Sequence, residues 1–278
     1  MVEVNRLTPQ LGAEITGVDL KRLSDAEFAA IYQAFLDSHV TVVRGQELGI
    51  HDYLGYSGRY GVVREHVNKS ARHPEFPKLM LLDNMANGAV AAPTPTLIKR
   101  GVGWHSDLGY EAVPAKATGL YAIILPSRGG DTLFSNMHLA YERLPEALKR
   151  RIDGRRATFK YGGRTKRSLA LLREEDRDQP VVMHDIVRVH PETGRKAIYI
   201  SPTQILEIEG MTPEDSATVI AELESCIEQP EITYRHKWEV GDTVVWDNRC
   251  LLHTATGDYP PNERRLHWRT TIMPPEIA

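Results

Sequence analysis

The sequence predicts a mainly β protein with peripheral helices, in the α+β or barrel-like class. Many short segments are rich in β-branched and aromatic residues, whereas only three segments have a helical pattern. The two kinds of segment do not alternate strictly, which disfavours a doubly wound parallel sheet. No Pro/Gly/Ser-rich linker divides the 278 residues, so we expect one domain over residues 1–278.

Each predicted helix has its own start or stop signal. The first begins at Ser24, which Glu27 follows at capping-box spacing. The second covers 138–154, and Pro145 predicts a break inside it. The third has Thr212 as cap and Pro213 at the first helical position.

The predicted strands account for most of the remaining periodic segments. Gly194 indicates a hairpin turn between two of them, and a Gly-Asp turn at 241–242 precedes another. The strands are expected at 40–44, 78–82, 117–125, 131–135, 185–190, 196–200, 232–238, 242–246 and 266–273.

Composition excludes several classes of protein. The net charge of −3 gives no electrostatic reason to expect nucleic acid as a partner. Two cysteines, Cys226 and Cys250, are too few for a disulfide scaffold. No apolar run is long enough for a signal peptide or a membrane span, so we expect a cytoplasmic protein without a membrane partner.

A metal site is the sharpest local prediction. His105 and Asp107 stand two residues apart, so on an extended strand they would share one face. His253, far downstream, is the best candidate for a third ligand. Two imidazoles and one carboxylate form the facial triad typical of non-haem iron(II) oxygenases. By itself His-x-Asp is a weak signal, and a surface histidine beside a capping aspartate is the alternative.

A cluster of arginines near the end of the chain suggests an anion site. Arg265 and Arg269 are four residues apart and would share one face of a strand, with Arg264 on the other. An arginine makes the bidentate pair that fixes a carboxylate. A solvated basic strand is the alternative.

Six separated blocks of sequence resemble the taurine dioxygenase / 2,4-dichlorophenoxyacetate dioxygenase family, whose members depend on iron(II) and 2-oxoglutarate. The blocks occur in the family's order over nearly the whole chain, which is far more specific than any one motif. They are residues 11–46, 104–107, 125–136, 187–200, 238–255 and 264–272.

The resemblance implies a double-stranded β-helix, or jelly roll, with helices outside. It implies Fe(II), 2-oxoglutarate and O2 as requirements, with succinate and CO2 as co-products of substrate hydroxylation. By position, Thr132 and Arg265 would bind the C5 carboxylate of 2-oxoglutarate, and Arg269 would lie near its C1 carboxylate and the substrate. The presence of Asp107 favours oxygenation over halogenation, because related halogenases lack this carboxylate.

The substrate expected is a small organic anion: a sulfonate, a sulfate ester, an aryloxyalkanoate or another carboxylate. His66 matches a substrate-binding histidine of the taurine enzymes, but Lys69 replaces their tyrosine and Gly101 an asparagine, which disfavours taurine. Lys69, Lys99 and Arg100 could contact an anion or be solvated. A homodimer or homotetramer is expected from the resemblance.

Other functions remain open from sequence alone. A zinc or manganese hydrolase or isomerase could use the same three ligands, but it would not need a dicarboxylate anchor. A non-catalytic relative should have lost a ligand or the anchor arginine. A nucleic-acid or peptide demethylase is a further reading, and the near-neutral charge opposes nucleic acid.

Overall fold

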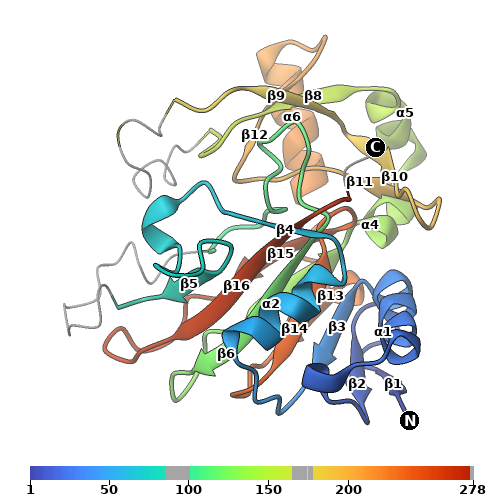
Figure 1. Cartoon of the computed structure of the whole chain (residues 1–278). Coiled ribbons are helices and arrows are strands. Elements are labelled where there is room, and N and C mark those ends of the chain that lie inside the picture. Colours follow the sequence, from blue (N-terminus) through green and yellow to red (C-terminus); the bar gives the residue numbers. More distant parts are fainter. Residues whose placement is uncertain (86–100, 165–173, 175–177, 276–278) are drawn as a thin grey trace.

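The computed structural model describes residues 1–85, 101–164, 174 and 178–275 (Figure 1). An eight-stranded sheet, with strand order β1-β2-β3-β14-β6-β16-β4 and β5 also paired with β16, is its largest element. Only β2 and β3 run parallel in this sheet. Its strands are β1 (Glu3–Arg6), β2 (Ala13–Thr16), β3 (Val40–Val43), β4 (Val62–Arg64), β5 (Met80–Asp83), β6 (Ala117–Ile124), β14 (Thr243–Asp247) and β16 (Leu266–Met273).

Three smaller sheets complete the β structure. One has the order β13-β7-β15, another β12-β8-β9, and β10 and β11 form a hairpin. Figure 1 shows β8, β9 and β12 with α5 and α6 beyond one end of the large sheet. The strands are β7 (Thr132–Asn136), β8 (Arg156–Phe159), β9 (Val182–Asp185), β10 (Val187–Val189), β11 (Lys196–Ile198), β12 (Ile205–Ile208), β13 (Thr233–His236) and β15 (Leu251–Ala255).

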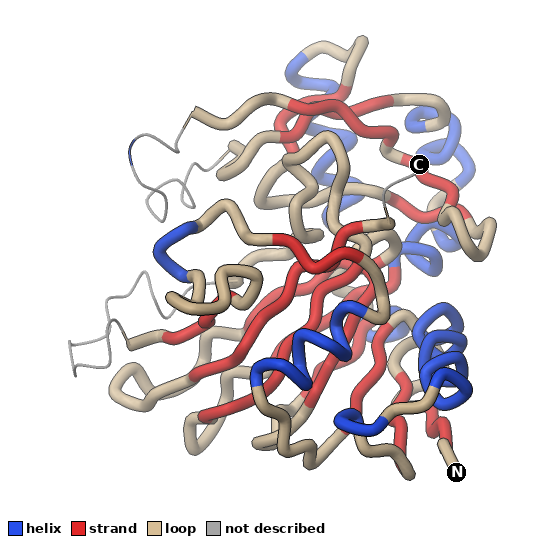
Figure 2. Tube along the Cα trace, viewed as in Figure 1, coloured by secondary structure: helices blue, strands red, loops and turns tan. Residues whose placement is uncertain are grey.

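Short helices lie around the sheets, as Figure 2 shows. They are η1 (Leu20–Arg22), α1 (Asp25–Ser38), α2 (Ile50–Gly58), η2 (Lys69–Ala71), α4 (Met137–Arg143), α5 (Glu146–Ile152), α6 (Pro213–Glu224) and η6 (Pro230–Ile232). The described part of the chain is therefore mainly β with peripheral helices, as the sequence predicts.

The predicted helix signals are confirmed. The Ser24 hydroxyl accepts a bond from the backbone of Glu27, whose carboxylate accepts one in return. Thr212 caps α6, with Pro213 in its first turn. The segment 138–154 is two helices, which separate at Pro145.

Helix α2 was not predicted from the sequence. Glycines at 55 and 58 weaken its intrinsic preference for helix. Tyr53 and Tyr56 are buried in the core beneath it, so burial of these side chains compensates for the low propensity. Tertiary packing, which no local pattern reveals, decides this element.

All nine predicted strand segments contain a strand, but seven strands were not predicted: β1, β2, β4, β8, β9, β12 and β15. They have three to five residues each, and β1 is exposed along its whole length. Strands this short form because a partner is available, and even where they alternate, as in β2 and β8, four residues are too few for a clear pattern.

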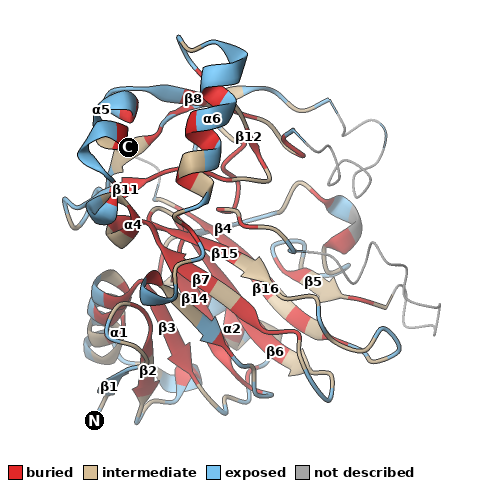
Figure 3. Cartoon of the chain, turned by 180° about the vertical axis from the view of Figure 1, so that it is seen from behind, coloured by how far each residue is buried: buried red, intermediate tan, exposed pale blue. Residues whose placement is uncertain are grey.

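Alternating residues of the large sheet separate two hydrophobic cores. Val244 and Trp246 of β14 face the core shared with the smaller sheets, whereas Val245 faces the core under α1 and α2. Leu120 and Tyr121 of β6 divide in the same way. Figure 3 shows that the central strands are largely buried. Polar side chains on the face of the large sheet that also carries Leu120, Val244 and Trp246 are therefore enclosed between the large sheet and the smaller sheets. The candidate site lies there.

None of the helices in the described segments is long and apolar enough to cross a membrane.

Candidate active site

Two histidines from distant segments are joined through their backbones. His105 and His253 form an isolated antiparallel bridge, with N–H···O distances of 3.1 Å from His105 to His253 and 2.9 Å in return. Their rings lie 4.2 Å apart, centroid to centroid. His253 belongs to β15 and pairs with Phe134 of β7. The bridge therefore attaches the segment around residue 105 to the small sheet β13-β7-β15.

Asp107 joins the two histidines, though not through the strand geometry considered for the two-residue spacing. Only His105 is in a bridge, and Asp107 lies in a turn that continues into Leu108 at φ 54°. The backbone N–H of Asp107 donates to the side chain of Asn248 at 3.3 Å instead of to a strand. The turn still brings the carboxylate to 3.8 Å from His105 Nε2 and 3.6 Å from His253 Nε2.

These three side chains are suited to hold a divalent metal ion. Each offers one ligand atom, and the three atoms lie within 4.8 Å of one another. His105 Nδ1 lies 2.7 Å from the carbonyl oxygen of Gly103. When Nδ1 donates this bond, the Nε2 lone pair is left for a metal. Two nitrogen donors, one carboxylate and no thiolate are the donor set of a non-haem iron(II) site.

The electrostatics favour the protonation states that a metal needs. Burial alone would raise the pKa of Asp107, but Arg269 and the two imidazoles outweigh burial and hold that pKa well below its usual range. Burial lowers the pKa of His253 to about 3. The carboxylate is thus ionised and the His253 imidazole neutral at neutral pH, as metal ligation requires.

A chain of buried hydrogen bonds orients Asp107. Thr118 of β6 donates to the carboxylate at 2.6 Å, and Asn248 donates to Thr118 at 2.9 Å. Trp246 in turn donates to the Asn248 side-chain oxygen at 3.1 Å. We did not predict these residues from the sequence. Thr118 was recognisable as a polar residue in an apolar strand, and Asn248 as a member of the block that contains His253.

Arg265 is a buried cation for which no ion pair is found within the described ranges. Its exposed fraction is 8%, and its Nε donates to the carbonyl oxygen of Gly130 at 3.1 Å. Burial lowers its pKa to about 10. Arg264, its neighbour, is exposed and pairs with Asp83 at 2.7 Å. The opposite environments of the two arginines agree with the predicted strand alternation.

Arg269 and Thr132 face the same space between the sheets. Arg269 Nη2 lies 2.8 Å from Asp107 Oδ1, so this arginine points at the candidate metal site. Thr132 is two residues before the buried Phe134 on β7, so both side chains point to the same face of the strand. Because Phe134 pairs with His253 and is buried in the core, Thr132 also faces inward. Its hydroxyl accepts a bond from Trp238 at 3.1 Å.

His66 lies beside this group. Burial, and next the charge of Arg269, lower its pKa to about 3, so the ring is neutral. Its Nδ1 accepts the backbone N–H of Asn68 at 3.0 Å, which leaves Nε2 as the protonated donor. Lys69 is exposed. Lys99 and Arg100 lie outside the described residues.

The chain is similar to several known proteins. The family model "Taurine catabolism dioxygenase TauD, TfdA family" matches residues 3–271. The chain is 31% identical to "(S)-phenoxypropionate/alpha-ketoglutarate-dioxygenase" of Sphingobium herbicidovorans, over 97% of this chain and 94% of that protein. It is 30% identical to "Alpha-ketoglutarate-dependent 2,4-dichlorophenoxyacetate dioxygenase" of Cupriavidus pinatubonensis, over 98% of each. A solved taurine dioxygenase from Burkholderia xenovorans has a TM-score of 0.81 at 31% identity, covering 98% of this chain and 91% of that one.

The protein is therefore a 2-oxoglutarate-dependent dioxygenase, an oxidoreductase that requires iron(II), 2-oxoglutarate and O2. It belongs to the TauD, TfdA family of taurine catabolism dioxygenases. The alternatives of a hydrolase, an isomerase or a non-catalytic relative find no support in these comparisons.

Replacement of Thr118 by valine is expected to weaken iron binding roughly 10- to 100-fold, because it removes a bond that orients Asp107. Thr243→Val is the matched control: Thr243 is equally buried, but its hydroxyl has no partner within the described structure. Iron(II) titration of both variants, followed by quenching of tryptophan fluorescence, measures the effect. Equal affinities would show that Thr118 does not position the ligand.

Proposed function

We propose that this dioxygenase hydroxylates a small organic anion at an iron(II) ion held by His105, Asp107 and His253. Thr132, Arg265 and Arg269 would bind 2-oxoglutarate. The observation that carries the proposal is the convergence of the three ligand groups, which Arg269 contacts, while Arg265, just before the same strand, is a buried arginine without an ion pair within the described segments. Such a cation is costly unless an anionic ligand completes it.

The chain's own residues would position both organic molecules. Arg265 is fixed by Gly130, so its Nη groups remain to make a bidentate pair with the distal carboxylate of 2-oxoglutarate. Thr132 would add a hydroxyl to that carboxylate. Arg269 would bind the proximal carboxylate beside the metal. When bound, iron(II) supplies the oxygen activation that couples decarboxylation of 2-oxoglutarate to substrate hydroxylation.

An aryloxyalkanoic acid is the first substrate to test. Two of the relatives are named for such acids. The neutral Nε2–H of His66 is suited to donate to a carboxylate, and Arg269 adds a positive charge. The buried hydroxyl of Tyr110 has no partner in the described structure, and the charges of Arg269 and Asp107 act on it. If the carbon next to the ether oxygen is hydroxylated, the resulting hemiacetal breaks into a phenol and an oxo acid.

We also propose that the large sheet and the β13-β7-β15 sheet are the two halves of a jelly roll, with the candidate site between them. A single catalytic domain over 1–278, a homodimer or homotetramer, a cytoplasmic location and the absence of nucleic-acid and membrane partners stay predictions.

The central prediction concerns turnover. With iron(II), ascorbate and 2-oxoglutarate, a panel of aryloxyalkanoates, sulfonates and alkyl sulfates is expected to yield succinate above the substrate-free rate. His105→Ala is expected to abolish this succinate without changing the circular dichroism spectrum, since it removes one ligand. Undiminished turnover by His105→Ala would exclude the proposed site.

The anchor of 2-oxoglutarate is tested by two neighbouring arginines. Arg265→Ala should raise the KM for 2-oxoglutarate roughly 100-fold, equal to about 3 kcal/mol, because a carboxylate would lose its buried partner. Arg264→Ala removes an equal charge from the exposed face and should leave that KM unchanged. Similar values for the two variants would place the anchor elsewhere.

The role of His66 is tested by separating the two organic substrates. His66→Ala should raise the KM for the primary substrate roughly 10-fold, the loss of one hydrogen bond to a charged group, with little change in the KM for 2-oxoglutarate. His73→Ala, in the same segment, is the control. A parallel rise in both KM values would indicate damage to the whole site and not loss of a substrate contact.

A further inference from the structure

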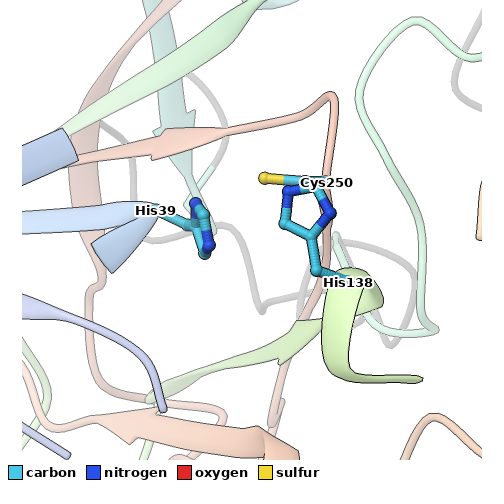
Figure 4. Close-up of side chains that lie close together, drawn as sticks. All are labelled: His39, His138 and Cys250. Carbon is cyan, nitrogen blue, oxygen red and sulfur yellow. The ribbon is translucent and has the colours of Figure 1, made fainter. Parts of the chain in front are cut away.

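A second group of metal-ligating side chains lies apart from the dioxygenase triad. His39 is the C-cap of α1, His138 is in the first turn of α4, and Cys250 lies between β14 and β15. Their side chains turn toward one another (Figure 4), and their ligand atoms lie within 4.8 Å of each other. All three residues are at most 1% exposed.

Two of these side chains have a buried ring nitrogen without a hydrogen-bond partner among the described residues. His138 Nδ1 lies 2.8 Å from the carbonyl oxygen of Lys196. Donation of that bond leaves a lone pair on Nε2, which is buried without a partner in the described structure. His39 Nδ1 is also buried and has no hydrogen-bond partner in the described structure. A buried polar atom without a partner costs about 1–3 kcal/mol. Two in one cluster therefore point to a ligand that would complete them.

The backbone around the cluster holds it in place without any ligand. The N–H of Met137 donates to the carbonyl of Cys250 at 3.0 Å, and the N–H of Asp247 donates to the carbonyl of His39 at 3.0 Å. His39 adopts φ 63°, a left-handed conformation that glycine usually provides at the end of a helix. A histidine at this position brings a ring into the cluster where glycine would bring none.

The neighbouring group of His190, Asp247 and Cys250 lacks this property. His190 Nε2 lies 3.0 Å from Asp247, and its Nδ1 accepts the N–H of Thr193 at 3.1 Å. Both carboxylate oxygens of Asp247 also accept bonds from Arg249. Since every ring nitrogen and carboxylate oxygen there has a partner, that group is a complete ion-pair network.

We propose that His39, His138 and Cys250 form a second, structural metal site for a soft d10 cation, Zn²⁺ or Cu⁺. One thiolate and two imidazoles suit both ions. Their bonds of about 2.0–2.3 Å require ligand atoms roughly 3.3–3.6 Å apart, so small side-chain rotations must draw the three groups together. On binding, the cation replaces the thiol proton of Cys250, which leaves to solvent. The bound ion would connect α1 and α4 to the turn that leads into β15 and His253.

The test uses a variant that lacks the two histidines of the proposed iron site, so that metal bound at that site does not interfere. The His105→Ala/His253→Ala variant is produced in zinc- or copper-supplemented medium, and metal per chain is measured by mass spectrometry. About one equivalent is expected. Adding Cys250→Ser should remove it, and Cys226→Ser, which alters a half-buried cysteine outside the cluster, should not. The ion retained identifies Zn²⁺ or Cu⁺ as the occupant.

A spectroscopic measurement on the unaltered chain covers the case in which Cys250→Ser does not fold. Cobalt(II) bound to a thiolate gives a sulfur-to-metal charge-transfer band in the near ultraviolet, which the triad alone cannot give. We expect this band in the intact protein and in Cys226→Ser, and a weaker band in His138→Gln. Absence of the band, together with no Cys250-dependent zinc or copper, would overturn the proposal. Because neither measurement records turnover, failure of the second site and failure of the proposed function are distinguishable.

Discussion

The backbone bridge between His105 and His253 is the constraint on which the site depends. It holds the rings of two residues far apart in sequence 4.2 Å from each other, centroid to centroid, against the entropy of closing a long loop. The bridge places one histidine on each side of a reciprocal pair of hydrogen bonds. The pairing of β15 with β7 then fixes His253 to the small sheet. Packing energy from the whole core thus positions the candidate ligands.

The position of the Asp107 carboxylate depends on the large sheet. The carboxylate is held by Thr118 from the large sheet, while its histidine partners are held by the small one. The candidate site therefore forms only if both layers pack in register. This explains how the three candidate ligand groups converge although one of them lies in a turn.

The fold and the site were predictable from the sequence to different extents. Caps such as Ser24 and Thr212 act locally, and the structure has both where the sequence predicts them. Helix α2 and most of the seven short strands depend on partners distant in sequence, so local patterns could not reveal them, whereas β1 pairs with the nearby β2 but is exposed and has no apolar pattern. The three metal-ligand candidates could be named because their residue types suit a metal and because they lie in blocks of sequence that occur in the family's order, whereas His-x-Asp alone would not have sufficed. The turn at Asp107 could not, because the side chain of Asn248 and not a local preference stabilises it.

The buried charges of the candidate site indicate how its ligands would depend on one another. Asp107 carries a negative charge, while Arg265 and Arg269 are positive and His66 and His253 are neutral, which leaves one net positive charge. A divalent metal ion alone would raise this to three positive charges. The 2-oxoglutarate dianion would return it to one, and an anionic substrate would bring it to zero.

Charge in a low-dielectric space is costly, so the metal ion would strengthen the binding of each anion, and each anion would strengthen the binding of the metal ion. The contact between Arg269 and Asp107 is part of this balance. Ligation of the metal withdraws the carboxylate's charge from Arg269, and the arginine is then available to an incoming carboxylate. The metal ion therefore couples positively with the co-substrate and with the anionic substrate, whereas the two anions draw on the same positive charge, and the two buried arginines reduce the repulsion between them.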